Sequence, residues 1–187
     1  MTESYDPLTA KLIRHPESPG LGVMLLEATA VRSAKRDVIL TYTVTGALHG
    51  LKIAPPRDGP GQREEGLWRH TCLELFAKSP DEPAYREFNF SPSGAWQTYA
   101  FRTYREGGAL PADALADRVP HISCSQTPTQ MVMQVTLPAA MLPAGPLMLG
   151  LSAVIESRDG RLAYWALRHP KPKPDFHDAH AFILELP

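Results

Sequence analysis

The sequence predicts an all-β protein, a two-sheet antiparallel β-sandwich that is jelly-roll-like and immunoglobulin-like in outline. Nineteen prolines and thirteen glycines divide the 187 residues into short segments. Most of these segments alternate polar with apolar side chains or are rich in β-branched and aromatic residues, and helical periodicity is nearly absent. About ten strands of this kind fit two sheets packed face to face.

The strands follow from this pattern in chain order, each bounded by proline, glycine or charged residues. They are predicted at residues 23–31, 38–45, 71–77, 86–90, 95–101, 121–125, 131–137, 148–157, 161–167 and 181–186. Two short runs, 111–116 and 138–142, each begin with proline followed by alanine, leucine or methionine. Such runs favour a single helical turn, so we expect them to be connectors between strands.

Three irregular segments separate the strands. Residues 54–66 are rich in proline, glycine and charge, which predicts an exposed loop that leads to Trp68. Residues 102–111 contain Gly107-Gly108 and are predicted to form a turn or loop. Residues 169–180 contain three prolines, which remove donors from any ladder, so this segment is predicted to form a rim outside the sheets.

Length, charge and cysteine content limit the domain number, the class of binding partner and the location that we expect for this protein. A length of 187 residues suits one domain, 1–187, and a net charge of -1 gives no electrostatic reason to expect nucleic acid or a membrane surface. The first residues carry acidic side chains and no long apolar run, so a cytoplasmic protein is expected. Cys72 and Cys124 lie in predicted strands and outside any C-x-x-C arrangement, which indicates reduced thiols. The sequence leaves the oligomeric state open.

Two polar residues stand out in predicted strands. Alternation places Glu74 on the same face as Cys72 and Phe76, opposite Leu73 and Leu75. A carboxylate at such a position needs a cation, hydroxyl donors or water. Its structural alternative is an ion pair with a neighbouring arginine or exposure to solvent.

Asn89 is set apart from the apolar residues of its strand in the same way. Its amide can donate and accept at once, which suits a hydroxyl-rich ligand. The structural alternative is that Asn89 holds the turn at 91–94.

The presence of aromatic residues distinguishes a sugar-binding site from other polar pockets, because the apolar face of a pyranose stacks on a flat ring. Trp68 precedes its strand and Phe176 lies in the proline-rich loop, so both are candidates for a rim. Trp96 and Trp165 are central in their strands and are expected in the core. Arg161 follows a turn, where its guanidinium would hold two hydroxyls, pair with Glu74 or form a rim salt bridge.

Three segments carry a family resemblance: LWRHTCLELF at 67–76, YREFNFSPSGAW at 85–96 and YWALRHPKPKPDFH at 164–177. They resemble DOMON-like domain proteins, which are similar to family 9 carbohydrate-binding modules. The resemblance implies non-catalytic binding of a small carbohydrate-type ligand in a cleft of the sandwich. It places the ligand-binding residues on Trp68, Glu74, Asn89, Arg161 and Phe176. The residues themselves lead us to expect no catalytic residue, no metal and no resident cofactor.

Three alternatives remain open. A haem-binding electron-transfer domain of the DOMON type would take Met131 and Met133, or Met24 and Met148, with a loop histidine. Residues 175–180 contain two aspartates and two histidines, enough to bind a cation such as a structural Ca²⁺, though in no recognised spacing. A glycan-cleaving enzyme would need two carboxylates across a cleft, with Glu74 paired to Glu87 or Asp175. The sequence carries no nucleophile elbow or phosphate loop, so an enzyme is the weaker hypothesis.

Overall fold

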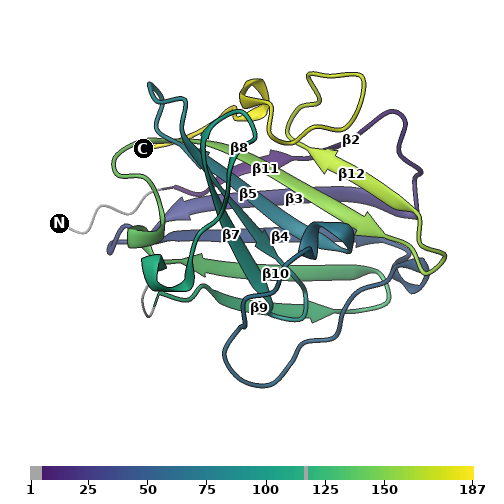
Figure 1. The fold of residues 1–187 in the computed structure, drawn as a ribbon. Helices are drawn as coiled ribbons and strands as arrows, with labels where there is room; N and C mark the ends of the chain where they lie inside the picture. Colours follow the sequence, from purple (N-terminus) through teal and green to yellow (C-terminus); the bar gives the residue numbers. More distant parts are fainter. Residues whose placement is uncertain (1–5, 116–117) are drawn as a thin grey trace.

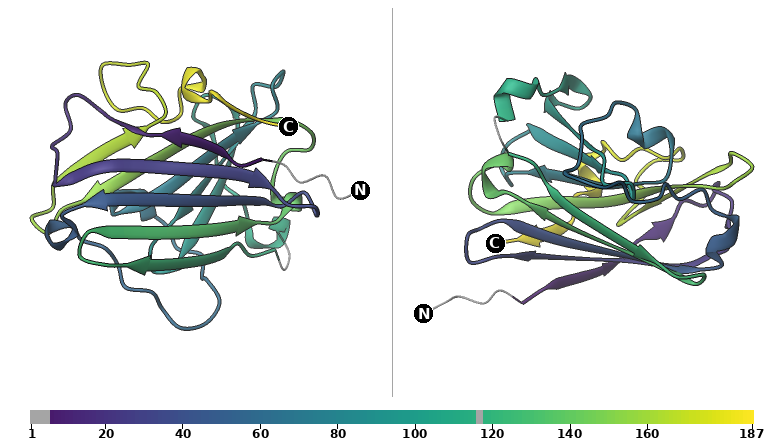
Figure 2. Two further views of the ribbon diagram at one scale, coloured as in Figure 1. Left: turned by 180° about the vertical axis from the view of Figure 1, so that it is seen from behind. Right: turned by 90° about the horizontal axis from the view of Figure 1, so that it is seen from below.

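The computed structural model describes residues 6–115 and 118–187 and shows the predicted two-sheet β-sandwich. The sheets contain five and eight antiparallel strands, counted over the described residues. Figure 2, in its right panel, shows them as two stacked layers. No helix in the described part of the chain is long and apolar enough to cross a membrane.

The smaller sheet has the strand order β1-β3-β4-β10-β9. Its strands are β1 (Leu8–Lys11), β3 (Val23–Arg32), β4 (Val38–Gly46), β9 (His121–Gln126) and β10 (Gln130–Leu137). Strand β4 is buried at every second residue, as expected for a sheet with one face on the core and one toward solvent. The outward positions of β4 are Ile39, Thr41, Thr43 and Thr45.

The larger sheet has the order β2-β12-β11-β5-β6-β7-β8, with β13 paired to β11 beside this path. Its strands are β2 (Ile13–Arg14), β5 (Cys72–Lys78), β6 (Tyr85–Phe90), β7 (Trp96–Thr103), β8 (Glu106–Ala109), β11 (Leu147–Glu156), β12 (Leu162–Ala166) and β13 (Leu184–Leu186). Figure 1 labels most of them. Strand β5 is central and nearly every residue in it is buried, so both of its faces are covered.

The core lies between the two sheets, and alternation along the strands supplies it. Leu40 and Val44 point inward from the smaller sheet, and Leu73 and Leu75 meet them from the larger one. Trp96 and Trp165 are also buried there, as predicted. The two cysteines are free thiols, also as predicted.

All ten predicted strands are present, with ends shifted by a few residues, most of all at 181–186. There η5 (Ala179–Ala181) precedes a strand of only three residues. The two predicted helical turns are η3 (Ala112–Leu115) and η4 (Ala139–Met141), although residues 116 and 117 lie outside the described part. The short strands β1 and β2 and the single turns η1 (Leu48–Gly50) and η2 (Leu67–Arg69) were not predicted.

The prediction of a loop over 102–111 is wrong in part. Strand β7 continues to Thr103, and β8 returns beside it after a tight turn at Tyr104 and Arg105. Gly107 faces Ala100 so closely that a Cβ atom would overlap the Ala100 carbonyl oxygen. The glycine that suggested a turn is therefore what lets the edge strand approach its neighbour.

The C-terminal segment covers part of the outer face of the larger sheet. Phe182 stacks on Phe76 with ring centroids 5.5 Å apart. It lies directly over Gly150, where an added Cβ would be 2.5 Å from the ring atom Cδ1 of Phe182. In Figure 1 the yellow chain runs from the η5 turn to the C-terminus, where β13 pairs with β11. The strand glycine thus makes room for an aromatic cover.

Candidate functional site

A pocket of about 680 Å³ lies on the outer face of the larger sheet. Its floor comes from five strands, and its wall comes from the loop after β12, the β7–β8 turn, η2 and the segment before β3. The lining residues are Glu17, Trp68, Glu74, Phe76, Glu87, Tyr99, Phe101, Arg105, Val154, Tyr164, Lys173, Pro174, Phe176 and His177. The size is that of a small-molecule site.

Two buried carboxylates form the polar part of the floor. Glu74 on β5 is 2% exposed and Glu87 on β6 is 6% exposed. In the register of these strands Glu74 is opposite Asn89, and Glu87 is opposite Phe76, so the two glutamates are diagonal neighbours on one face. The alternation predicted for β5 and β6 is confirmed, because Leu73, Leu75, Phe88 and Phe90 point to the core instead.

The described residues give these carboxylates only neutral hydrogen-bond donors at close range. The Ser152 hydroxyl donates to Oε2 of Glu74 at 3.1 Å. The Asn89 amide nitrogen donates to Oε1 of Glu87 at 2.9 Å. The amide oxygen of Asn89 is buried and accepts no hydrogen bond from any described residue. The floor therefore presents more acceptors than donors.

Burial controls the charge of the floor. Desolvation, and next the charge of Glu87, raise the pKa of Glu74 well above its ordinary range, against a hydrogen bond from Ser152. Desolvation raises the pKa of Glu87 to about 7, although the hydrogen bond from Asn89 and the charge of Arg105 act in the opposite direction. Near neutral pH the pair therefore holds a proton.

His177 stands over Glu87 as a neutral ring. Burial, followed by the charge of Arg105, lowers its pKa to about 4. The Tyr85 hydroxyl lies 2.8 Å from Nδ1 of His177 and also accepts the backbone N–H of Arg105 at 3.0 Å. In this arrangement the hydroxyl donates to Nδ1, which leaves the hydrogen on Nε2, 3.6 Å from the Glu87 carboxylate.

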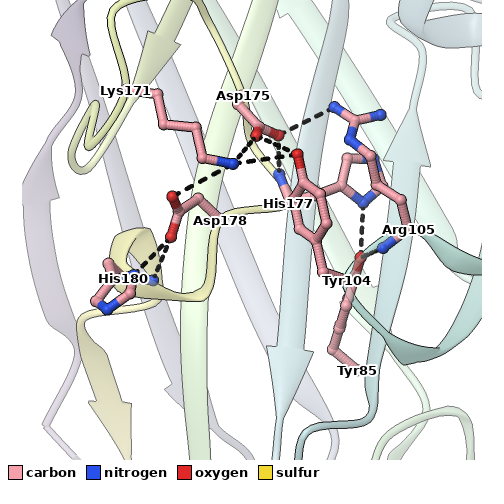
Figure 3. A network of polar contacts seen from close by, with 8 residues as sticks. All are labelled: Tyr85, Tyr104, Arg105, Lys171, Asp175, His177, Asp178 and His180. Carbon is pink, nitrogen blue, oxygen red and sulfur yellow. Dashed lines mark hydrogen bonds and ion pairs between the residues drawn. The ribbon is translucent and has the colours of Figure 1, made fainter.

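One carboxylate holds the wall of the pocket in place. Asp175 lies in the proline-rich loop and accepts hydrogen bonds from Lys171 at 2.6 Å, Tyr104 at 2.7 Å and Arg105 at 3.0 Å. Figure 3 shows these side chains converging on Asp175 from the loop and from the β7–β8 turn. Burial alone would raise the pKa of Asp175, but these donors outweigh it and lower the pKa. The wall is thereby tied to the sheet edge.

Two aromatic residues of the lining come from outside the sheets. Trp68 lies in η2, which begins after Gly66 in a left-handed conformation, and its side chain is 47% exposed, as the sequence predicted for a rim residue. The Arg69 guanidinium lies 5.0 Å from the centroid of the Trp68 ring. Phe176 packs edge-on against Tyr164 with centroids 6.0 Å apart. The pocket thus combines aromatic surface with buried oxygen acceptors.

The comparisons with known proteins agree with this fold. No family model matches the chain, and no curated protein matches it. One similar solved structure is the crystal structure of a "putative carbohydrate-binding protein" from Bacteroides uniformis, with a TM-score of 0.62 and 13% sequence identity. The match covers 97% of this chain and 85% of the other. At that identity the likeness establishes a shared fold.

Three of the five residues that the resemblance marked line the same pocket, namely Trp68, Glu74 and Phe176. Asn89 is not among the lining residues: it is fully buried, and its amide nitrogen donates to Glu87. Arg161 lies elsewhere: it is exposed in the turn before β12, and its Nε donates to Asp159 at 2.8 Å. It does not pair with Glu74, because the local turn supplies a nearer carboxylate.

The structure also shows where the residues proposed for haem binding and for metal binding lie. Met131 and Met133 are buried in the core between the sheets, Met24 is exposed, and Met148 packs near Phe76, so no pair of these methionines meets in the pocket. In the described ranges, no group of three or more histidine, cysteine or acidic side chains is arranged to hold a metal ion. Within 175–180, Asp175 and Asp178 pair with Lys171, Asp178 also pairs with His180, and His177 contacts Tyr85 and Glu87.

Sequence reasoning missed several lining residues. Glu87 was named only as a partner of Glu74 in a glycan-cleaving enzyme, although it shares a face with Asn89 and the same alternation could have selected it as a binding residue. His177 follows Phe176 in the loop, but its contact with Tyr85 joins positions that are 92 residues apart. Arg105 was missed because its turn was assigned to a longer loop. These two depend on tertiary contacts that no local pattern encodes.

Proposed function

We propose that this protein binds a small carbohydrate-type ligand in the pocket on its larger sheet, without catalysing a reaction. The observation that carries the proposal is the pairing of aromatic wall residues, Trp68 and Phe176, with an acceptor-rich floor around Glu74 and Glu87. Sugar rings have apolar C–H faces and a rim of hydroxyl donors, so they complement such a surface.

The binding residues follow from this geometry. Trp68 offers an exposed ring at the mouth, and Phe176 adds a second ring from the proline-rich loop. Glu74 and Glu87 would accept hydrogen bonds from sugar hydroxyls, and so would the free amide oxygen of Asn89. The motif resemblance to DOMON-like proteins and family 9 modules supports the same class of ligand.

The position of the carboxylates favours binding over hydrolysis. In most glycoside hydrolases the two carboxyl groups flank the scissile bond from different sides of the sugar. Here Glu74 and Glu87 are on adjacent strands of one floor, so a ring lying on that floor meets both from the same side. Asp175, the other residue considered as a partner, is engaged by three donors.

The test is a thermal-shift screen of monosaccharides, disaccharides and nucleotide sugars, followed by calorimetric titration of each compound that stabilises the protein. A ligand that binds the native state raises the melting temperature. We expect Glu74→Gln to weaken binding at least tenfold, with the melting temperature of the free protein maintained. Glu27→Gln, on the outward face of the smaller sheet, is the matched control.

Two outcomes would overturn the proposal. One is that no compound in the screen stabilises the wild-type protein. The other is a Soret band in the absorbance spectrum of the purified protein, or stabilisation by haem alone, which would make electron transfer the leading account.

A further inference from the structure

We infer that the ligand presents a protonated amine to the floor of the pocket, so that its sugar is an amino sugar with a free amino group. The ammonium would lie between Glu74 and Glu87. This inference rests on the proposed function and narrows its ligand class.

The first argument is the imbalance of hydrogen-bonding groups. Glu74 and Glu87 together receive two hydrogen bonds from neutral side chains, those of Ser152 and Asn89. The oxygen of the Asn89 amide is fully buried and receives none from the described residues. Such an acceptor costs free energy until a donor reaches it. An ammonium group supplies three donors at one point, whereas a hydroxyl supplies one.

The second argument is the missing counter-charge. Arg105 lines the pocket, but its guanidinium pairs with Asp175. His177 faces Glu87 as a neutral ring. Among the described residues, no lysine or arginine forms an ion pair with Glu74 or Glu87, and the side chains of Glu17 and Tyr99 add no positive charge. Lys173 is exposed at the mouth.

The third argument is the proton that the pair retains. Two neighbouring buried carboxylates avoid double ionisation because one of them stays protonated. When the ligand binds, its ammonium group supplies the positive charge that this proton supplied before. The Glu74–Glu87 pair then releases the proton to the solvent. Binding is therefore expected to release protons near neutral pH, which a neutral sugar would not do.

The experiment is calorimetric titration with glucosamine, galactosamine and mannosamine, each compared with its parent hexose and its N-acetyl derivative. We expect at least one amine to bind about tenfold or more tightly than both neutral counterparts, as a charge-assisted contact is stronger than a neutral one. Titration in two buffers of different ionisation enthalpy should show a net release of protons for that amine.

The matched variant is Glu87→Gln, which keeps the shape and removes the charge. It should bring the affinity for the amine close to that for the parent hexose and abolish the proton release. Glu27→Gln should change neither. The inference is overturned if no amine binds more tightly than its neutral counterparts, or if Glu87→Gln keeps the preference. Binding of the neutral sugars alone would overturn the inference and leave the proposed function standing. If none of these sugars binds, the inference is overturned, and the disaccharides and nucleotide sugars of the thermal-shift screen decide the proposed function.

Discussion

His177 and Glu87 face each other in the pocket, with Nε2 of the imidazole 3.6 Å from Oε2 of the carboxylate, and both side chains are displaced toward their uncharged forms. An ordinary surface pair of this kind would carry opposite charges. Here burial opposes both charges at once, so the contact is a close approach of two groups held toward their neutral forms rather than a salt bridge.

This neutrality predicts two opposing dependences of stability on pH. Glu87 has a pKa of about 7 in the folded protein, raised from 4.5, so its contribution to stability is present below pH 4.5 and is lost as the pH rises through 7. His177 has a pKa of about 4, lowered from 6.5, so the free energy of unfolding rises with pH between these values.

Single variants should separate the two slopes. In urea unfolding between pH 4.5 and 6.5, Glu87→Gln should make stability rise more steeply with pH, because the opposing effect of the glutamate is gone. His177→Gln should make stability fall with pH over the same range. Identical pH profiles for wild type and both variants would show that neither group is perturbed.

Asp175→Asn should loosen the wall of the pocket. The variant loses the ion pairs with Lys171 and Arg105, and we expect a loss of about 1 to 2 kcal/mol in the free energy of unfolding. Faster amide hydrogen exchange over residues 168–178 should accompany it. Asp159→Asn, whose exposed partner Arg161 lies outside the pocket, should leave exchange in this loop unchanged. Unaltered exchange in Asp175→Asn would mean that the prolines alone hold the wall.

Trp68→Ala should separate binding from stability. The ring is about half exposed, so its removal should change the free energy of unfolding by less than about 0.5 kcal/mol. Loss of its stacking surface should weaken binding of a responsive sugar by about tenfold. Met24→Ala, at an exposed position on the smaller sheet, serves as the control in the same titration. Equal affinity for wild type and Trp68→Ala would remove this residue from the site.

Gly150→Ala should destabilise the fold by about 1 to 3 kcal/mol in urea unfolding, because the new methyl group would overlap the Phe182 ring. The matched control is Gly108→Ala on the exposed strand β8, where an added Cβ meets no atom within 4 Å. The double variant Gly150→Ala/Phe182→Leu should lose less free energy of unfolding than the two single variants lose when their losses are added. Additive losses would contradict direct contact between these two positions.

Local patterns were sufficient for most of the fold. Period-two alternation identified ten strands and assigned Glu74 to the face opposite Leu73 and Leu75. It failed at β8, because Gly107 and Gly108 carry no side chains to alternate. It also failed at β1 and β2, where four and two residues are too few to show a period.

The site was predicted less completely. Trp68, Glu74 and Phe176 share the pocket, whereas Arg161 pairs within its own turn. The contact of Asp175 with Arg105 links residues 70 positions apart and depends on how the C-terminal loop crosses the sheet. Such a contact follows from the path of the chain in space, which single-sequence periodicity does not contain.

The anchoring of the proline-rich wall has a consequence for protein engineering. Residues 168–178 form no strand in either sheet and are held by Asp175, by the contact of His169 with the Ile13 carbonyl and by the contact of His177 with Tyr85. A library that keeps these three residues of the segment with Lys171, Tyr104 and Arg105 and randomises the other lining positions of this segment would alter the wall while both sheets retain their backbone pairing. The segment can thus be exchanged as a cassette to give one scaffold a series of ligand preferences.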